Sequence, residues 1–374
     1  SVFIPSSHPE IAVSTPRSVL SVVLIASAAL LVGSSQLCCQ SPDEEARIRK
    51  LTERLNRLEA KLAIAGAAAD SASTTPASRR LTWFEEHKRM RSATPHKDMR
   101  WHFLGPDNVS GRITDLAVPM PRGRTYTIYA ATATGGVWRS VNEGTSWEPI
   151  FDQEASTSIG DIALDPSNPD VLWVGTGEAN IFRSSTAGCG IYKTEDGGKT
   201  WQHRGLGDTH TIARVVVHPK DSNTVYVAAG GHEWTDNPER GVYKTTDGGE
   251  SWQCVLSVDE RTGAVDLVIN PEHPDVLYAA TWQRIRRHWN DPRMEDGYDK
   301  NGVWKTTDGG ATWQPINVGL PAAEVRGRIG IDLCKAQPST LYAFVDCYEI
   351  AKGESPKGED SYGRSRKKTI EGAQ

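Results

Sequence analysis

Carboxylate, indole, imidazole and guanidinium side chains gather in segments of this sequence that could carry chemistry. Three carboxylates are candidates for acid and base groups: Glu178, Glu233 and Asp291. Beside them stand five candidate ligand-binding residues: His232, Trp234, Trp282, Arg284 and Trp289. Indole rings can stack on sugar rings, and guanidinium groups pair with carboxylates through two hydrogen bonds. Two carboxyl groups can hydrolyse a glycosidic bond when they lie about 5–5.5 Å or about 6.5–9.5 Å apart. The alternative is that these aromatic side chains only pack loops against each other.

The elements that position these groups follow from an eight-residue pattern at residues 140–147, 194–201, 245–252 and 306–313. It begins with Ser or Thr, has Asp or Asn third and Gly fifth, and ends with Trp. Asp or Asn accepts hydrogen bonds from the amides of a turn, and Gly supplies the positive φ. Trp is large enough to pack between neighbouring sheets. We therefore assign a structural role to Asn142, Trp147, Asp196, Trp201, Asp247, Trp252, Asp308 and Trp313.

Alternating strand patterns precede each of these turns. One lies at 241–244, and an earlier pair joined by a Pro/Asp/Asn turn recurs at 161–173 and 214–226. Each period thus predicts four strands, A to D, joined as a meander, and radial repetition of such sheets is a β-propeller. The sequence predicts an all-β fold: four complete four-stranded blades and a truncated fifth, preceded by a short N-terminal helix. We expect further blades beyond Gln374.

The repeats resemble the Asp-box, or bacterial neuraminidase, repeat of sialidases, xyloglucanases, photosystem assembly factors and sortilin-type receptors. The chain is most similar to exported bacterial propeller proteins described as sortilin-like or glycosyl-hydrolase-like, over residues 101–346. The segments that carry the resemblance are 111–115, 135–138, 175–180 and 263–268. The same blade hosts both hydrolases and binding proteins, so the resemblance implies a fold rather than an activity.

Two enzyme classes within this resemblance can be compared with the residues. A sialidase needs an arginine triad, but Arg112, Arg214 and Arg328 are out of register with one another. A xyloglucanase-type site needs two aspartates in a cleft between two propellers, and half of that architecture is absent from this sequence. We therefore favour a scaffold that binds protein or glycan ligands. The alternative is a glycoside hydrolase, xyloglucanase-like or sialidase-like, that acts on polysaccharide.

Two parts of the propeller are expected to place side chains for function. Strand A of each blade lines the central channel, and counting back from each A–B turn puts four residues at one equivalent position: Asp115, Asp161, Arg214 and Asp266. The alternative to chemistry there is a paired, solvated ring of charges. The B–C loops lie on the face opposite the Asp boxes, are long in blades 2 to 4, and contain the candidates above. Long loops on a rigid scaffold are a common location for binding sites.

The N-terminal region predicts export. Residues 18–33 form an uncharged apolar run behind Arg17, which is typical of a signal peptide, and an uncleaved anchor that extends to Leu37 is the alternative. A coiled-coil spacing follows at Ile48, Leu51, Leu55, Leu58 and Leu62. It indicates either self-association through residues 44–62 or a lone amphipathic helix. The predicted domains are 1–40 signal or anchor, 41–64 coiled-coil-like helix, 65–100 flexible linker, 101–350 propeller and 351–374 loop or truncated tail.

Composition limits the partners. A net charge of -5 argues against nucleic acid, and the six cysteines have no C-x-x-C spacing typical of a metal site. We expect no metal, no cofactor, and membrane contact only through the N-terminal segment. The expected location is secreted, periplasmic or at the cell surface, with a protein or carbohydrate ligand. The four later cysteines are interpreted as isolated thiols.

Overall fold

A computed structural model describes residues 75–99, 111–120, 123, 125–180, 185–285, 299–334 and 336–347. The chain divides into two units, Ser1–Ser73 and Thr74–Gln374, and all described residues belong to the second. The predictions for 1–40, 41–64 and 351–374, and those for Trp289 and Asp291, lie outside the described residues. Among the described residues, no helix is long and apolar enough to cross a membrane.

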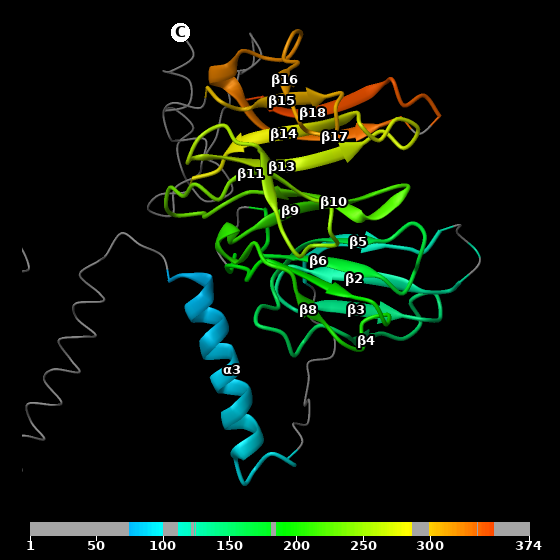
Figure 1. Cartoon of the computed structure of the whole chain (residues 1–374), viewed down its shortest axis with the longest axis vertical. Coiled ribbons are helices and arrows are strands. Elements are labelled where there is room, and N and C mark those ends of the chain that lie inside the picture. Colours follow the sequence, from blue (N-terminus) through cyan, green and yellow to red (C-terminus); the bar gives the residue numbers. More distant parts are fainter. Residues whose placement is uncertain are drawn as a thin grey trace, which may run out of the picture. The chain divides into compact units, whose positions relative to one another are not determined.

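Four antiparallel four-stranded sheets and one two-stranded sheet follow one another along the chain (Figure 1). The first holds β1 (Ile113–Ala117), β2 (Ile128–Thr132), β3 (Val137–Ser140) and β4 (Glu148–Pro149). The second holds β5 (Ile159–Leu164), β6 (Leu172–Thr176), β7 (Ile191–Thr194) and β8 (Gln202–His203). The third holds β9 (Ile212–His218), β10 (Asp221–Ala229), β11 (Gly241–Thr245) and β12 (Gln253–Leu256). The fourth holds β13 (Thr262–Ile269), β14 (Leu277–Gln283), β15 (Gly302–Thr306) and β16 (Gln314–Pro315), and the fifth β17 (Arg326–Leu333) and β18 (Leu341–Cys347).

Within every sheet the strands pair in chain order, which is a meander. This confirms the predicted β-propeller blades, whose strands A to D are the first to fourth of each sheet. In the described residues the fifth sheet contains strands A and B alone.

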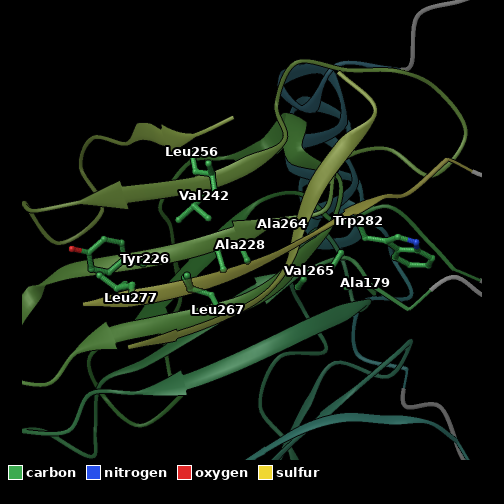
Figure 2. Close-up of a cluster of buried hydrophobic side chains, with 12 residues drawn as sticks. Ala179, Tyr226, Ala228, Val242, Leu256, Ala264, Val265, Leu267, Leu277 and Trp282 are labelled. Atoms are coloured by element: carbon green, nitrogen blue, oxygen red, sulfur yellow. The ribbon is translucent and has the colours of Figure 1, made fainter. Parts of the chain in front are cut away.

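The hydrophobic core lies between consecutive sheets. Strand B carries a buried aromatic residue in each of the four-stranded sheets: Tyr129 packs against β5, Trp173 against β9, Tyr226 against β13 and Tyr278 against β17. Figure 2 shows the cluster between the third and fourth sheets, where Tyr226 and Val242 of one sheet meet Leu267 and Leu277 of the other. The alternation of the strands therefore buries both faces of the inner sheets.

The repeated turn has the geometry that the sequence predicts. Asp308 Oδ1 accepts the amide of Thr312 at 2.9 Å, and its Oδ2 accepts the Thr312 hydroxyl at 2.6 Å. The Thr306 hydroxyl donates to Asp308 Oδ1 at 2.7 Å and accepts the amide of Gly310 at 3.0 Å. Gly310 has φ +94°, where a side chain would be strained. Asn142, Asp196 and Asp247 have the same role in their turns.

The tryptophans that end these turns differ in their hydrogen bonds. Trp201 Nε1 donates to Ile150 O and Trp252 Nε1 to Arg204 O, both at 2.7 Å, so each indole is bonded to the preceding sheet. Trp147 instead bonds within its own turn. Trp313 Nε1 is buried, and no described residue is hydrogen-bonded to it.

A helix occupies much of the stretch expected to be a flexible linker. Helix α3 spans Ala77–Ala93, so the linker prediction for 65–100 is wrong over these residues. The segment has no Gly or Pro and contains four Arg, two Glu and two Ala, which favour helices. Its N-terminus is fixed to the second blade, because the Ala77 amide donates to Asp208 Oδ1 at 2.7 Å and Arg80 Nη2 to Gly207 O at 3.1 Å. Ala77 is its buried residue.

Candidate functional site

The four A-strand charges occupy the equivalent positions that the sequence predicts. Each lies directly after a register shift in its sheet, opposite a small residue of strand B: Asp115 faces Ala131, Asp161 faces Gly175, Arg214 faces Ala228 and Asp266 faces Ala280. The three carboxylates each accept an amide from the next sheet. Ile162 N donates to Asp115, Val215 N to Asp161 and Ile331 N to Asp266, at 3.3, 2.7 and 2.8 Å.

Arg214 joins this row of carboxylates from the third sheet. Its Nη1 donates to Asp161 Oδ1 and its Nε to Asp266 Oδ1, both at 3.0 Å. Asp161 and Asp266 are buried rather than solvated. Burial raises the pKa of Asp161 well above its usual value, and Asp115 and Asp266 raise it further, while Arg214 opposes the rise. Burial also raises the pKa of Asp115. These four side chains thus link neighbouring sheets through hydrogen bonds and ion pairs. A chemical role in the central channel stays a prediction.

Glu178, on the B–C loop of the second blade, is completely buried. Its two carboxylate oxygens accept Nε and Nη2 of Arg112 at 2.9 and 2.5 Å, and its amide donates to Ser158 Oγ at 3.0 Å. Hydrogen bonding to Glu178 raises the pKa of Arg112. A two-point pair of this kind fixes orientation as well as charge. This carboxylate therefore holds the first and second blades together in the described structure.

Arg284 connects the loops of three blades. Its side chain is fully buried and donates to Ala179 O at 3.0 Å, to Glu178 O at 3.2 Å and to Gly231 O at 3.4 Å. Glu233 Oε2 lies 3.7 Å from its Nη2. Burial lowers the pKa of Arg284 to about 10. The guanidinium thus holds these loops together through hydrogen bonds to their backbone carbonyls.

The burial of Arg284 and Trp282 corrects two predictions. Both were expected to contact a ligand, but Arg284 has no exposed surface and Trp282 is 7% exposed. Carbonyl groups of the loops surround the guanidinium, and the indole packs in the core between the third and fourth blades. Arg328 lies over the Trp282 ring, 5.9 Å from its centroid. Both side chains therefore pack within the protein, and neither presents a surface for a ligand.

A cavity of about 140 Å³ opens beside Glu233, the neighbour of Arg284. It is lined by Ser185, Thr186, Ala187, His210, Thr211, His232, Glu233, Trp234 and Thr235. The structure thus brings together three predicted site residues, one of which, Trp234, is 40% exposed. The wall combines a carboxylate, hydroxyl groups, imidazoles and an indole, which is a set able to hold a polar ring.

His210 also lines the cavity, and no motif in the sequence singled it out. Its ring stacks on His232 with centroids 3.6 Å apart and planes at 25°. His232 Nδ1 lies 2.8 Å from Thr235 Oγ1, and its Nε2 lies 3.2 Å from Asp208 O. Burial lowers the pKa of His210 to about 3, with His232 adding to the effect. In the sequence it stands two residues before strand A of the third blade, which begins at Ile212.

Arg240 is a second residue of this region that the sequence motifs did not indicate. It is fully buried behind the cavity and donates to Gly230 O and His232 O, both at 2.6 Å. Burial lowers the pKa of Arg240 to about 9, and Arg284 lowers it further. Its bonds fix the backbone of the loop that carries His232, Glu233 and Trp234.

Comparison with known proteins supports the resemblance to both sortilin-like and glycosyl-hydrolase-like propellers. A family model described as "Sortilin, neurotensin receptor 3" matches residues 189–336. A xyloglucanase of Paenibacillus sp is 24% identical over 298 residues, which are 73% of this chain and 28% of that protein. An oligoxyloglucan-reducing end-specific xyloglucanase of Emericella nidulans is 28% identical over 148 residues, which are 37% of this chain and 14% of that protein. The chain thus spans less than a third of these relatives.

A solved GH74 enzyme of Niastella koreensis overlaps 68% of this chain and 36% of its own, at 20% identity and a TM-score of 0.43.

Proposed function

We propose that this chain forms part of an exported glycoside hydrolase that acts on a polysaccharide of the xyloglucan type. The observation that carries the proposal is the similarity over 73% of the chain to a protein named xyloglucanase. It favours the hydrolase over the binding scaffold that the sequence alone suggested. Export rests on the apolar run at 18–33.

Glu233 is the carboxylate that we assign to the reaction. It is the one acidic side chain among the residues that line the cavity, and the buried Arg284 guanidinium lies 3.7 Å away. In the reaction a carboxylate at this place would act as a general base or stabilise positive charge on the sugar. A glycosidase needs a second carboxyl group, and among the described residues that line the cavity Glu233 is the only acidic one.

Incubation of the full chain with xyloglucan, followed by assay of reducing sugar, tests the proposal. We expect release by the wild type and a loss of about 10²–10⁴-fold in Glu233→Gln, the range for a removed acid–base group. Glu239→Gln is the matched control, because Glu239 follows in the same loop and accepts a hydrogen bond from Asn237. Equal rates in wild type and Glu233→Gln would remove Glu233 from the reaction.

A binding scaffold for glycan or protein is the second candidate. It is favoured by the arginine neighbours of the two described candidate carboxylates. Glu178 is ion-paired with Arg112, and Glu233 lies beside Arg284. Both arrangements are compatible with purely structural roles. Retention of the chain on xyloglucan without any release of reducing sugar would support this candidate and reject the hydrolase.

A further inference from the structure

His210 lines the cavity in a backbone conformation that side chains rarely adopt. It has φ +57° and ψ -36°, directly after the 3₁₀ turn Gly207–Thr209. Non-glycine residues in such regions are strained and persist where the surroundings fix them, often at ligand sites. Here the stacked ring of His232, 3.6 Å away, and a hydrogen bond from the Gly188 amide to His210 O at 2.7 Å fix it.

The His210 ring has one nitrogen that needs a partner. Its Nε2 is buried, and no described residue is hydrogen-bonded to it. Buried polar atoms in folded proteins nearly always have a hydrogen-bond partner. A ligand in the adjoining cavity could supply one.

The charges around the cavity select the kind of group that would bind. The buried guanidinium groups of Arg240 and Arg284 disfavour a cation, and the Glu233 carboxylate in the wall disfavours an anion. A neutral imidazole nitrogen pairs with a hydroxyl in either tautomer, because a hydroxyl both donates and accepts. These surroundings select a neutral ligand rich in hydroxyl groups.

The size of the cavity limits that ligand to one ring. Its volume is about 140 Å³, close to the roughly 150 Å³ of an engineered protein cavity that admits benzene. Trp234, 40% exposed at the wall, offers an indole for the apolar face of a sugar. We infer that this cavity binds a single neutral pyranose unit, at a chain end or a branch, with His210 Nε2 bonded to a sugar hydroxyl. The inference deepens the proposed function and rests on it for the choice of polysaccharide.

Binding of monosaccharides to the full chain tests the inference. The probes are D-glucose, D-xylose, D-galactose and D-glucuronate, measured by saturation-transfer NMR and calorimetry. We expect at least one neutral sugar to bind, and glucuronate to bind at least tenfold more weakly. His210→Gly removes the imidazole where glycine adopts the backbone angles freely. It should weaken binding at least tenfold and leave the melting temperature equal or higher.

The control is Glu143→Gly, which relieves a similar φ of +58° in a turn of the first sheet and should leave binding unchanged. Binding of no neutral sugar, equal binding by wild type and His210→Gly, or a preference for glucuronate would each overturn the inference. Release of reducing sugar from xyloglucan is read separately. Sugar binding without release rejects only the proposed hydrolase, and release without monosaccharide binding rejects only the pyranose site.

Discussion

The backbone amide of Val215 donates a 2.7 Å hydrogen bond to Asp161 Oδ2. This bond joins the innermost strands of the second and third sheets, β5 and β9. In the same way, the Ile162 amide donates to Asp115 and the Ile331 amide donates to Asp266. The A-strand carboxylates therefore link consecutive sheets, and Arg214 is ion-paired with two of them, Asp161 and Asp266.

Replacing Arg214 with Met should lower the free energy of unfolding by about 1–3 kcal/mol. The change leaves Asp161 and Asp266 without their shared guanidinium, and breaking a buried pair by removing one partner costs more than the pair contributes. The figure is below the fully buried case because the Arg214 side chain is 39% exposed and solvent screens part of its charge. Urea unfolding measures the change. Lys88→Met, in an exposed helical pair with Glu85, should have little effect, and an equal loss in both variants would contradict the argument.

Asp161→Asn should become more stable relative to wild type as pH rises from about 4 to about 8. The raised pKa of Asp161 means that the folded chain keeps a proton that the unfolded chain releases near its ordinary value of 3.8. This stabilising contribution is complete below about pH 3.8 and is lost as pH rises through the folded value. Asparagine stays neutral and retains an oxygen for Val215. Urea titrations at both pH values would show the trend, and a constant difference between the two proteins would refute the pKa argument.

Trp201→Phe should cost about 1 kcal/mol more than Trp313→Phe. Both changes shorten an indole at the end of a repeated turn, but Trp201 Nε1 donates to Ile150 O and Trp313 Nε1 has no hydrogen bond among the described residues. A typical intramolecular hydrogen bond contributes about 0.5–1.5 kcal/mol. Guanidinium unfolding of the two variants provides the comparison. Equal losses would mean that ring packing alone decides the role of these tryptophans.

Asp308→Ala should destabilise the chain at pH 5 and much less at pH 2. Hydrogen bonds from the hydroxyl and amide of Thr312 lower the pKa of Asp308 to about 2. The contribution of a carboxylate with a lowered pKa is present above its ordinary value and is lost as pH falls through the folded value. Melting temperatures of both proteins from pH 5 to pH 2 should therefore converge. A gap that stays the same over this range would show that the carboxylate charge is unimportant.

The fold could be predicted because its signals are local and repeated. The turn around Asp308 is held by residues two to four positions apart, so the pattern in the sequence is the pattern of the bonds. The equivalent positions of Asp161 and Arg214 followed from strand alternation counted back from a recognisable turn. Such short-range rules carry over from blade to blade.

The candidate site could be predicted only in part because its contacts join distant loops. Nothing near Arg284 in the sequence shows that carbonyl groups more than 100 residues earlier would surround its guanidinium. His210 belongs to the site through a stacking contact with another loop. Helix α3 has no apolar stripe, and the contacts of Ala77 and Arg80 with the second blade that fix its start are equally long-range.

The bonds between A strands also have a direction. In each, the acceptor carboxylate belongs to the earlier sheet and the amide donor to the later one. Domains made during synthesis form from the N-terminus onward, and repeat arrays propagate between nearest neighbours. Each sheet therefore presents a carboxylate acceptor to the strand that is synthesised next, so the bond between two sheets can form as soon as the later A strand has been made.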